Sequence, residues 1–190
     1  CRADGGQKRA GAAEPLSARA HIVPVFVPHL GCRHDCVFCN QRQIAGQAAA
    51  AGPKDVAAAL APLCAAPRRR RELAFYGGSF TAVEPALRRA LLEAAQPWLR
   101  AGVIGAIRVS TRPDAVDAAA LAELRAFGVT TVELGAQSMD DAVLRASGRG
   151  HTAEDTRRAA ALVKAAGLQL VLQMMTGLPG AAEESDMETA

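Results

Sequence analysis

The feature that most constrains the fold is a pattern in which a glycine ends a helical segment and an apolar run follows it. It occurs three times, at Gly102, Gly128 and Gly167, in the segments AGVIGAIRVS, FGVTTVELG and AGLQLVLQM. A glycine often terminates a helix in the left-handed conformation, and a continuous apolar run is typical of a strand buried in a parallel sheet. The glycines are 26 and 39 residues apart, spacings that suit strand–helix units rather than a solenoid. The pattern therefore predicts a parallel α/β fold.

Five apolar runs are predicted as strands, and a helical segment follows each of the first four. The strands are expected over residues 22–27, 73–76, 106–110, 130–134 and 168–174. The helices are expected to begin at Pro53, at Pro85, after Asp114 as an N-cap, and at a capping box formed by Thr152 and Asp155. Five such units fit either an open doubly wound sheet or an incomplete barrel.

The length of 190 residues indicates one domain. Residues 1–20 lack periodicity and are predicted as a poorly ordered lead-in, and residues 21–190 as the core domain. The chain begins with Cys1, and its last segment has helix-forming composition without a stop signal, so we expect a fragment. No apolar run approaches the ~20 residues that a membrane span needs. The net charge of +3 is too small to indicate nucleic-acid binding by itself.

Three of the five cysteines lie within eight residues, in the segment GCRHDCVFC directly after the first predicted strand. Cys32, Cys36 and Cys39 have the spacing C-x3-C-x2-C, and thiolates are ligands of zinc and of iron–sulfur clusters. Structural zinc sites commonly use two C-x2-C pairs, whereas this sequence has no second pair and His34 lies inside the same loop. The trio suits a [4Fe-4S] cluster with one iron left open. A zinc loop and a Cys36–Cys39 redox pair remain as alternatives.

Other features receive simpler interpretations. The odd cysteine count and the lack of a visible secretory signal favour the reducing cytoplasm. Cys64, Met174 and Met175 are expected to fill the core, since they lie among apolar residues. The basic run 68–71 is expected to be a solvated loop rather than an RNA contact, because it precedes a strand.

Polar and glycine residues gather where the predicted strands end. Gly77 and Gly78, in FYGGSFT, allow the backbone to approach a ligand closely. The polar residues are Ser110, Thr111 and Arg112 after the third strand, Gln137 after the fourth and Gln173 late in the fifth. In α/β barrels these ends build the active site. Arg108 and Glu133 are expected either to pair inside such a barrel or to face helices.

The cysteine loop and the Gly-Gly turn resemble those of the radical S-adenosylmethionine (SAM) enzymes. The resemblance implies a [4Fe-4S] cluster on Cys32, Cys36 and Cys39, with SAM chelating the fourth iron, and an incomplete parallel (β/α) barrel truncated after about five strands. The residues implied to contact SAM are Phe38 near the adenine, Gly77, Gly78 and Ser79 at the methionyl amino group, Ser110 and Gln173 at the ribose, and Gln137 and Arg149 at the methionyl group. Ser79 stands where the superfamily has an acid.

Several segments resemble the radical domain of the Elongator catalytic-subunit family more specifically. They are PVFVPHLGCRHDCVFCNQRQIAG, AFYGGSFT, IRVSTRPD, VELGAQSMDDAVLRASGRGHT and QMMTGLPG. This resemblance implies reductive cleavage of SAM to methionine and a 5′-deoxyadenosyl radical, in the modification of a wobble uridine in tRNA. It also implies a flavodoxin- or ferredoxin-like one-electron donor. The alternatives are chemistry like that of the coproporphyrinogen oxidases and a non-catalytic, metal-stabilised RNA-binding scaffold.

Overall fold

One parallel sheet of five strands organises the chain. A computed structural model describes residues 20–27, 31–32, 36–39, 51–67 and 70–190. The strands are β1 (His21–Phe26), β2 (Arg71–Tyr76), β3 (Ala106–Thr111), β4 (Val129–Gln137) and β5 (Gln169–Met174), and they lie in the order β1-β2-β3-β4-β5. A doubly wound sheet reverses its strand order at a switch point, whereas a barrel wall does not. The strict sequential order therefore favours the barrel alternative.

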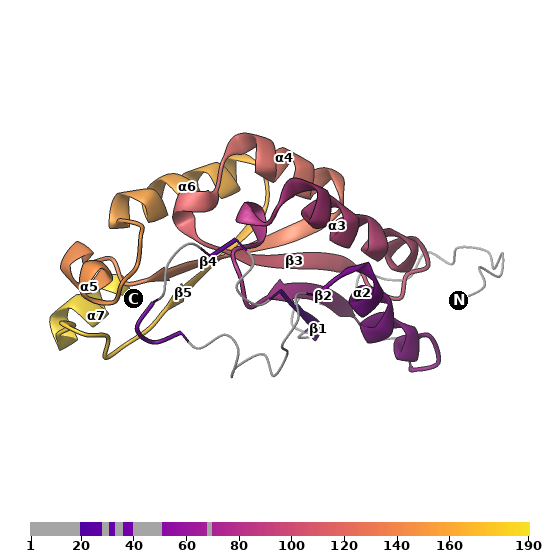
Figure 1. The fold of residues 1–190 in the computed structure, drawn as a ribbon, viewed down its shortest axis with the longest axis horizontal. Helices are drawn as coiled ribbons and strands as arrows, with labels where there is room; N and C mark the ends of the chain where they lie inside the picture. Colours follow the sequence, from indigo (N-terminus) through magenta and orange to yellow (C-terminus); the bar gives the residue numbers. More distant parts are fainter. Residues whose placement is uncertain (1–19, 28–30, 33–35, 40–50, 68–69) are drawn as a thin grey trace.

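Most helices lie on one face of this sheet. The helical elements are α2 (Pro53–Leu60), η1 (Ala61–Cys64), η2 (Phe80–Ala82), α3 (Pro85–Arg100), η3 (Pro113–Ala115), α4 (Ala118–Ala126), α5 (Asp141–Ala146), α6 (Ala153–Ala165) and α7 (Glu183–Thr189). Figure 1 shows α3, α4 and α6 along that face, and α5 and α7 near the ends of β4 and β5.

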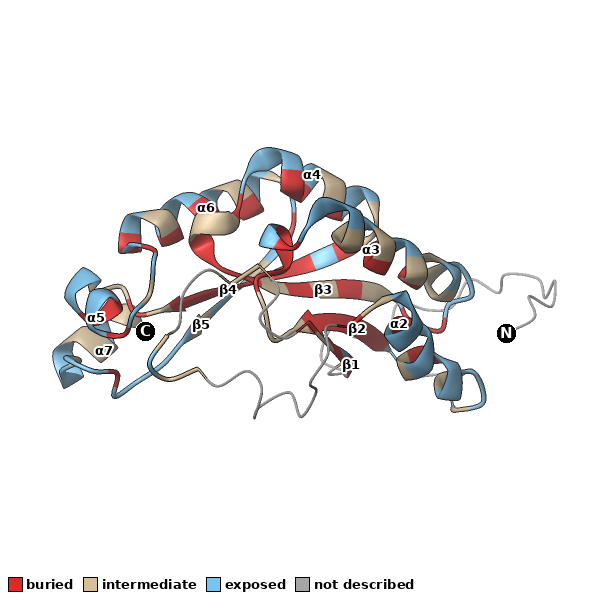
Figure 2. Ribbon diagram, in the orientation of Figure 1, coloured by how far each residue is buried: buried red, intermediate tan, exposed pale blue. Residues whose placement is uncertain are grey.

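The hydrophobic core fills the space between the sheet and these helices. Side chains of alternate strand residues point toward it, because successive residues of a strand face opposite sides. The fully buried members include Leu73, Phe75, Ile107, Val109, Val132 and Leu134 from the strands, and Leu91, Leu92, Leu124 and Val163 from the helices. The Phe75 ring stacks on Phe80 with centroids 4.7 Å apart. Figure 2 shows this burial along the strands.

The opposite face of the sheet carries charged side chains. In β3 the residues at this face, which include Arg108 and Ser110, are half-buried, whereas their neighbours in sequence are buried. The Arg108 guanidinium binds two carboxylates, with Nη1 2.7 Å from Glu133 Oε1 and Nη2 2.8 Å from Glu72 Oε2. Of the two possibilities left open by the sequence, Arg108 and Glu133 therefore pair with each other.

The helix after β3 begins later than predicted. Its N-cap is Asp117, whose carboxylate accepts a hydrogen bond from the Ala120 amide at 2.7 Å. Asp114 lies in the turn η3 and instead binds Arg112, with distances of 3.0 Å and 2.7 Å. The prediction of an Asp114 cap was wrong because Asp114 has a stronger, charged partner two residues away. The capping box of Thr152 and Asp155 is confirmed.

Three other expectations are corrected. Cys64 is exposed, and it lies in the short turn η1, which has no buried residue. Met174 and Met175 are each 36% exposed, since β5 has β4 as its only strand neighbour within the described residues. In the basic run, Arg71 is buried and donates hydrogen bonds to the carbonyls of Pro67 and Val103, so this part of it is not solvated.

Residues 1–19 of the predicted lead-in lie outside the described residues. Within the described part of the chain, no helix combines the length and the apolar character that crossing a bilayer requires.

Candidate functional site

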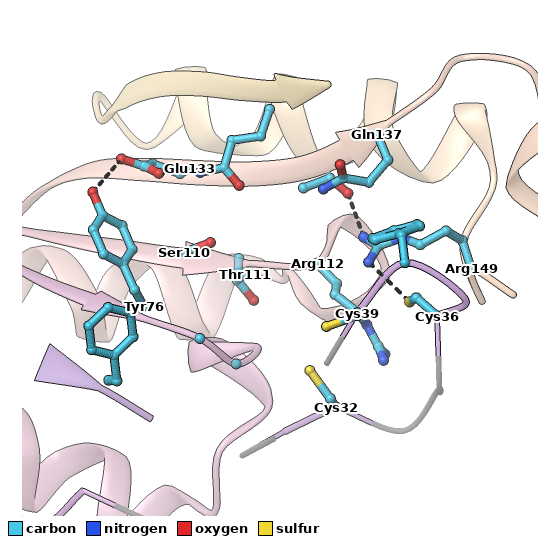
Figure 3. Close-up of a pocket in the computed structure, with 16 residues that line it drawn as sticks. Cys32, Cys36, Cys39, Tyr76, Ser110, Thr111, Arg112, Glu133, Gln137 and Arg149 are labelled. Atoms are coloured by element: carbon cyan, nitrogen blue, oxygen red, sulfur yellow. Dashed lines mark hydrogen bonds between the residues drawn. The ribbon is translucent and has the colours of Figure 1, made fainter. Parts of the chain in front are cut away.

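A cavity of about 380 Å³ lies against the ends of the strands. All five strands contribute to it, directly or through the loops that follow them. It is lined by Phe26, Cys32, Cys36, Phe38, Cys39, Tyr76, Gly77, Gly78, Ser110, Thr111, Arg112, Glu133, Gly135, Gln137, Arg149 and Gln173. Figure 3 shows the three cysteines at one end and Tyr76 with Glu133 at the other.

The cysteine loop is held against the barrel at several points. A Cβ atom at Gly31 would overlap the Ser79 carbonyl oxygen and lie 2.7 Å from the Ala82 carbonyl carbon, so only glycine fits this close approach. Farther along, the Val37 amide donates to the Ser147 carbonyl at 3.1 Å. These contacts bring the thiols of Cys32, Cys36 and Cys39 to the same cavity.

Two arginines lie at the cysteine end, Arg149 and the Asp114-paired Arg112. Arg149 donates from Nη1 to Cys36 Sγ at 3.5 Å and from Nη2 to the Gly135 carbonyl at 2.6 Å. Arg112 Nη1 and Arg149 Nε are buried without a hydrogen-bond partner among the described residues. Burial raises the pKa of the Cys32 thiol, and the nearby Arg112 guanidinium acts in the opposite direction. Because buried guanidinium N–H groups need acceptors, this end suits an anionic ligand.

The end of β4 is shaped to let Arg149 reach the cavity. A Cβ atom at Gly135 would lie 2.9 Å from Gln137 Nε2 and 3.3 Å from Arg149 Nη2. Gln137 itself has a φ of 68°, the one positive φ of a non-glycine residue in the described ranges. The register with β5 shifts at this point. Gly135 thus makes room for two of the predicted cofactor residues.

The Gly-Gly turn after β2 places its two glycines in the cavity wall, as expected, but not Ser79. Ser79 is fully buried, and its hydroxyl shares a hydrogen bond with that of Thr111 at 2.9 Å. It also accepts from the Arg112 amide at 3.2 Å. Ser79 therefore joins the end of β3 to the turn beneath the cavity, and its side chain is not among those that line the cavity.

A buried carboxylate organises the other end. Glu133 Oε1 accepts from the Tyr76 hydroxyl at 3.1 Å and from Arg108 Nη1 at 2.7 Å, while its Oε2 accepts from Gln173 Nε2 at 2.5 Å. Burial, and then the Glu133 charge, raise the pKa of Tyr76 to about 12. The phenol therefore keeps its hydrogen near neutral pH.

The structure brings together nearly all residues predicted from the sequence. The predicted residues that line the cavity are Cys32, Cys36, Cys39, Phe38, Gly77, Gly78, Ser110, Gln137, Arg149 and Gln173. Sequence reasoning missed Phe26, Tyr76 and Gly135. Phe26 and Tyr76 are the last residues of paired strands and lie directly beside each other. Their position at a strand end was the signal that could have found them.

The three thiols share the cavity without converging on one point. Within the described ranges, no three His, Cys, Asp or Glu side chains are grouped closely enough to hold a single metal ion. A cluster of several irons binds each thiolate through a different metal atom, so its ligands lie farther apart than those of one zinc ion. The cavity residues fit a cluster with an anionic co-ligand.

Comparison with known proteins gives sequence relatives over part of the chain. Over 81 residues the chain is 38% identical to the tRNA uridine(34) acetyltransferase of Methanocaldococcus infernus. This aligned segment is 43% of this chain and 15% of that protein. Over 82 residues it is 37% identical to Elongator complex protein 3 of Saccharomyces cerevisiae, with the same coverage. The matched segment thus spans a small part of these curated relatives.

Solved structures match over most of the chain. The structure of Methanocaldococcus infernus Elp3 with an N-terminal deletion matches with a TM-score of 0.66 at 25% identity. The match covers 90% of this chain and 41% of the Elp3 chain. Coproporphyrinogen III oxidase (HemN) from Escherichia coli has a TM-score of 0.65 at 21% identity, over 90% and 40% of the two chains, and shows the fold alone. The predicted incomplete barrel is confirmed. The family model described as the Radical SAM superfamily matches residues 26–190, and the chain therefore belongs to the radical SAM superfamily.

Proposed function

We propose that this domain binds a [4Fe-4S] cluster and SAM, and that the radical it generates serves the modification of a wobble uridine in tRNA. The observation that carries the proposal is the single cavity in which three thiols and seven further residues implied to contact SAM meet. Residues that are far apart in sequence, such as Cys36 and Arg149, approach each other there.

Members of the superfamily generally use this cluster and SAM, and the bound pair supplies a 5′-deoxyadenosyl radical by one-electron reduction of the sulfonium. The protein's own part is to bind and orient. Arg149, with a buried Nε that lacks a partner in the described chain, is suited to bind the SAM carboxylate. Gly77 and Gly78 offer backbone groups without side chains in the way. Ser110 and Gln173, beside Glu133, offer oxygens to ribose hydroxyls.

The relatives support a proposal for the substrate. The first matched proteins are tRNA uridine(34) acetyltransferases and Elongator complex protein 3, so we propose a tRNA wobble uridine as the target. A flavodoxin- or ferredoxin-like protein would supply the electron. Iron–sulfur clusters held by cysteine thiolates suit a reducing compartment, and we propose the cytoplasm.

The test uses the full-length protein that contains this domain, reconstituted anaerobically with iron and sulfide. We expect acid-labile sulfide in the protein and reductant-dependent formation of 5′-deoxyadenosine. Replacement of Cys32, Cys36 and Cys39 by Ala should reduce both to background, whereas Lys164→Ala, on the exposed side of α6, should change neither. Unchanged 5′-deoxyadenosine in the triple variant contradicts the proposal.

Metal analysis separates the alternatives. A zinc-stabilised RNA-binding scaffold would contain zinc without sulfide, and a thiol redox protein would show a reversible Cys36–Cys39 disulfide without iron. Coproporphyrinogen-oxidase-like chemistry would give 5′-deoxyadenosine that depends on a porphyrinogen rather than on tRNA.

A further inference from the structure

The end of the cavity away from the cysteines holds a network in which Gln173 is the one member already assigned to SAM, and Tyr76, Arg108 and Glu133 have no role so far. Glu133 of β4 accepts hydrogen bonds from Tyr76 of β2, Arg108 of β3 and Gln173 of β5. Tyr76, Glu133 and Gln173 line the cavity. Figure 3 shows Tyr76 and Glu133 on the far side of Ser110 from the cysteines. One carboxylate therefore fixes side chains from three other strands at this end.

The hydrogen bonds to Glu133 decide what this end offers to a ligand. A carboxylate only accepts, and a phenol has a single hydrogen to donate. Because Tyr76 donates that hydrogen to Glu133, its oxygen has only lone pairs left for other groups. Gln173 directs its Nε2 to Glu133, which leaves its carbonyl oxygen as an acceptor. The network thus presents acceptors, which need a ligand with N–H or O–H donors.

The charges at this end are balanced and weakly screened. Glu72 and Glu133 both bind Arg108, at 2.8 Å and 2.7 Å, and Glu72 also pairs with the more exposed Arg70 at 3.6 Å. The two carboxylates have side chains that are only 6% exposed, so water screens them weakly. Because these two guanidiniums are already paired, the site does not attract an anion and suits a neutral ligand with hydrogen-bond donors.

Two aromatic side chains form part of the cavity wall at this end. Phe26 and Tyr76 are register partners at the ends of β1 and β2, and both line the cavity. Aromatic rings are the surfaces against which proteins stack single-stranded bases. A planar heterocycle with a donor on its edge satisfies both the wall and the acceptors.

We propose that this end is the substrate subsite and that Tyr76 is its specificity-determining residue. The substrate base packs against Phe26 and donates a ring N–H to the Tyr76 oxygen, which Glu133 holds in place. This inference rests on the proposed function, and in uridine the donor is the imide at N3. Tyr76 acts as a fixed acceptor, so it recognises the base and takes no proton from it.

The test measures RNA binding without turnover, using the full-length reconstituted protein with SAM and no reductant. The probes are two anticodon stem-loop RNAs that differ only in a uridine or an N3-methyluridine at the wobble position. Loss of one hydrogen bond changes affinity by about tenfold or less, so we expect the native protein to bind the methylated RNA about fivefold to tenfold more weakly. Tyr76→Phe keeps the ring and removes the oxygen, and it should bind both RNAs with the same Kd.

Matched variants distinguish a loss of base recognition from a general loss of folded, cluster-loaded protein. Glu133→Gln should also reduce the discrimination, whereas Lys164→Ala should preserve it, with all proteins compared at equal iron content. Equal affinity of the native protein for the two RNAs, or full discrimination by Tyr76→Phe, overturns the subsite. Absence of reductant-dependent 5′-deoxyadenosine in the native protein overturns the proposed function instead, and the two failures are distinguishable because the binding assay needs no radical.

Discussion

The two faces of the sheet are built in opposite ways from residues that alternate along the same strands. The face toward the helices is apolar, as in Phe75 and Val109, which are fully buried. The face toward the cavity is polar, as in their neighbours Tyr76 and Arg108. Burying an apolar side chain contributes about 1.5–3 kcal/mol, whereas a buried ion pair contributes little net stability. The polar face is therefore the part of the sheet kept for binding, and changes to the two faces should have different consequences.

The largest expected effect on the cavity side comes from Gly31→Ala. The new Cβ would overlap the Ser79 carbonyl, and the φ of 73° disfavours any side chain. The cysteine loop would be displaced, so we expect most of the iron and sulfide to be lost from the reconstituted protein. Gly102→Ala is the matched control, because its φ is 65° but no atom lies within 4 Å of the added Cβ. Full cluster loading in Gly31→Ala would show that this contact does not position the loop.

The largest effect on the helix side should come from Phe75→Ala. The side chain is fully buried and stacks on Phe80, and such truncations destabilise by about 3–5 kcal/mol. Urea denaturation should show this loss, while cluster loading at low temperature is retained. If Phe75→Ala lost iron and sulfide but kept its stability, the proposed separation between an apolar, stabilising face and a polar, binding face would be wrong.

The charged network should respond more weakly. Arg108→Met leaves Glu133 without its cation and Glu72 with only the more distant Arg70, and because the Arg108 side chain is 21% exposed we expect about 2 kcal/mol of destabilisation. Arg89→Ala is the exposed counterpart, with a side chain 60% exposed and with Arg88 still bound to Glu123, and it should change stability by about 0.5 kcal/mol or less. Similar denaturation midpoints for the two variants would contradict the burial argument.

The remaining prediction concerns the pH dependence of stability. Burial, and then the Arg149 charge, lower the pKa of His151 to about 4, from an ordinary value of about 6.5 in the unfolded chain. The unfolded state therefore binds the proton first, so this stability is fully present above about pH 6.5 and is lost as the pH falls toward 4. His151→Asn should flatten the pH dependence of the urea midpoint over that interval. An unchanged slope would exclude His151 as the titrating group.

Much of the fold was predictable because its signals are local. Pro53 and Pro85 begin helices where expected, and Gly102, Gly128 and Gly167 each precede a strand with positive φ. The cap at Asp117 and the short helix α5 were missed. In the first case a competing partner, Arg112, had removed Asp114 from capping.

The sequence predicted most of the residues that line the site, but not the contacts between them. Motif position identified Arg149, yet nothing local indicates that Gly135 must lack a side chain to admit it. Ser79 fell within a ligand-binding motif, and only the packing of Thr111 against it shows its hydroxyl beneath the cavity wall.

The sequence by itself determined the parallel strand–helix alternation, the cysteine trio and the strand ends that carry polar groups, because each depends on residues close together in the chain. Only the tertiary structure decided which face of the sheet would be polar, that Glu133 would hold side chains from three other strands, and which guanidinium atoms would remain without partners. Strand periodicity tells which residues share a face, but the strand order and the side on which the helices pack determine which of those faces encloses the cavity.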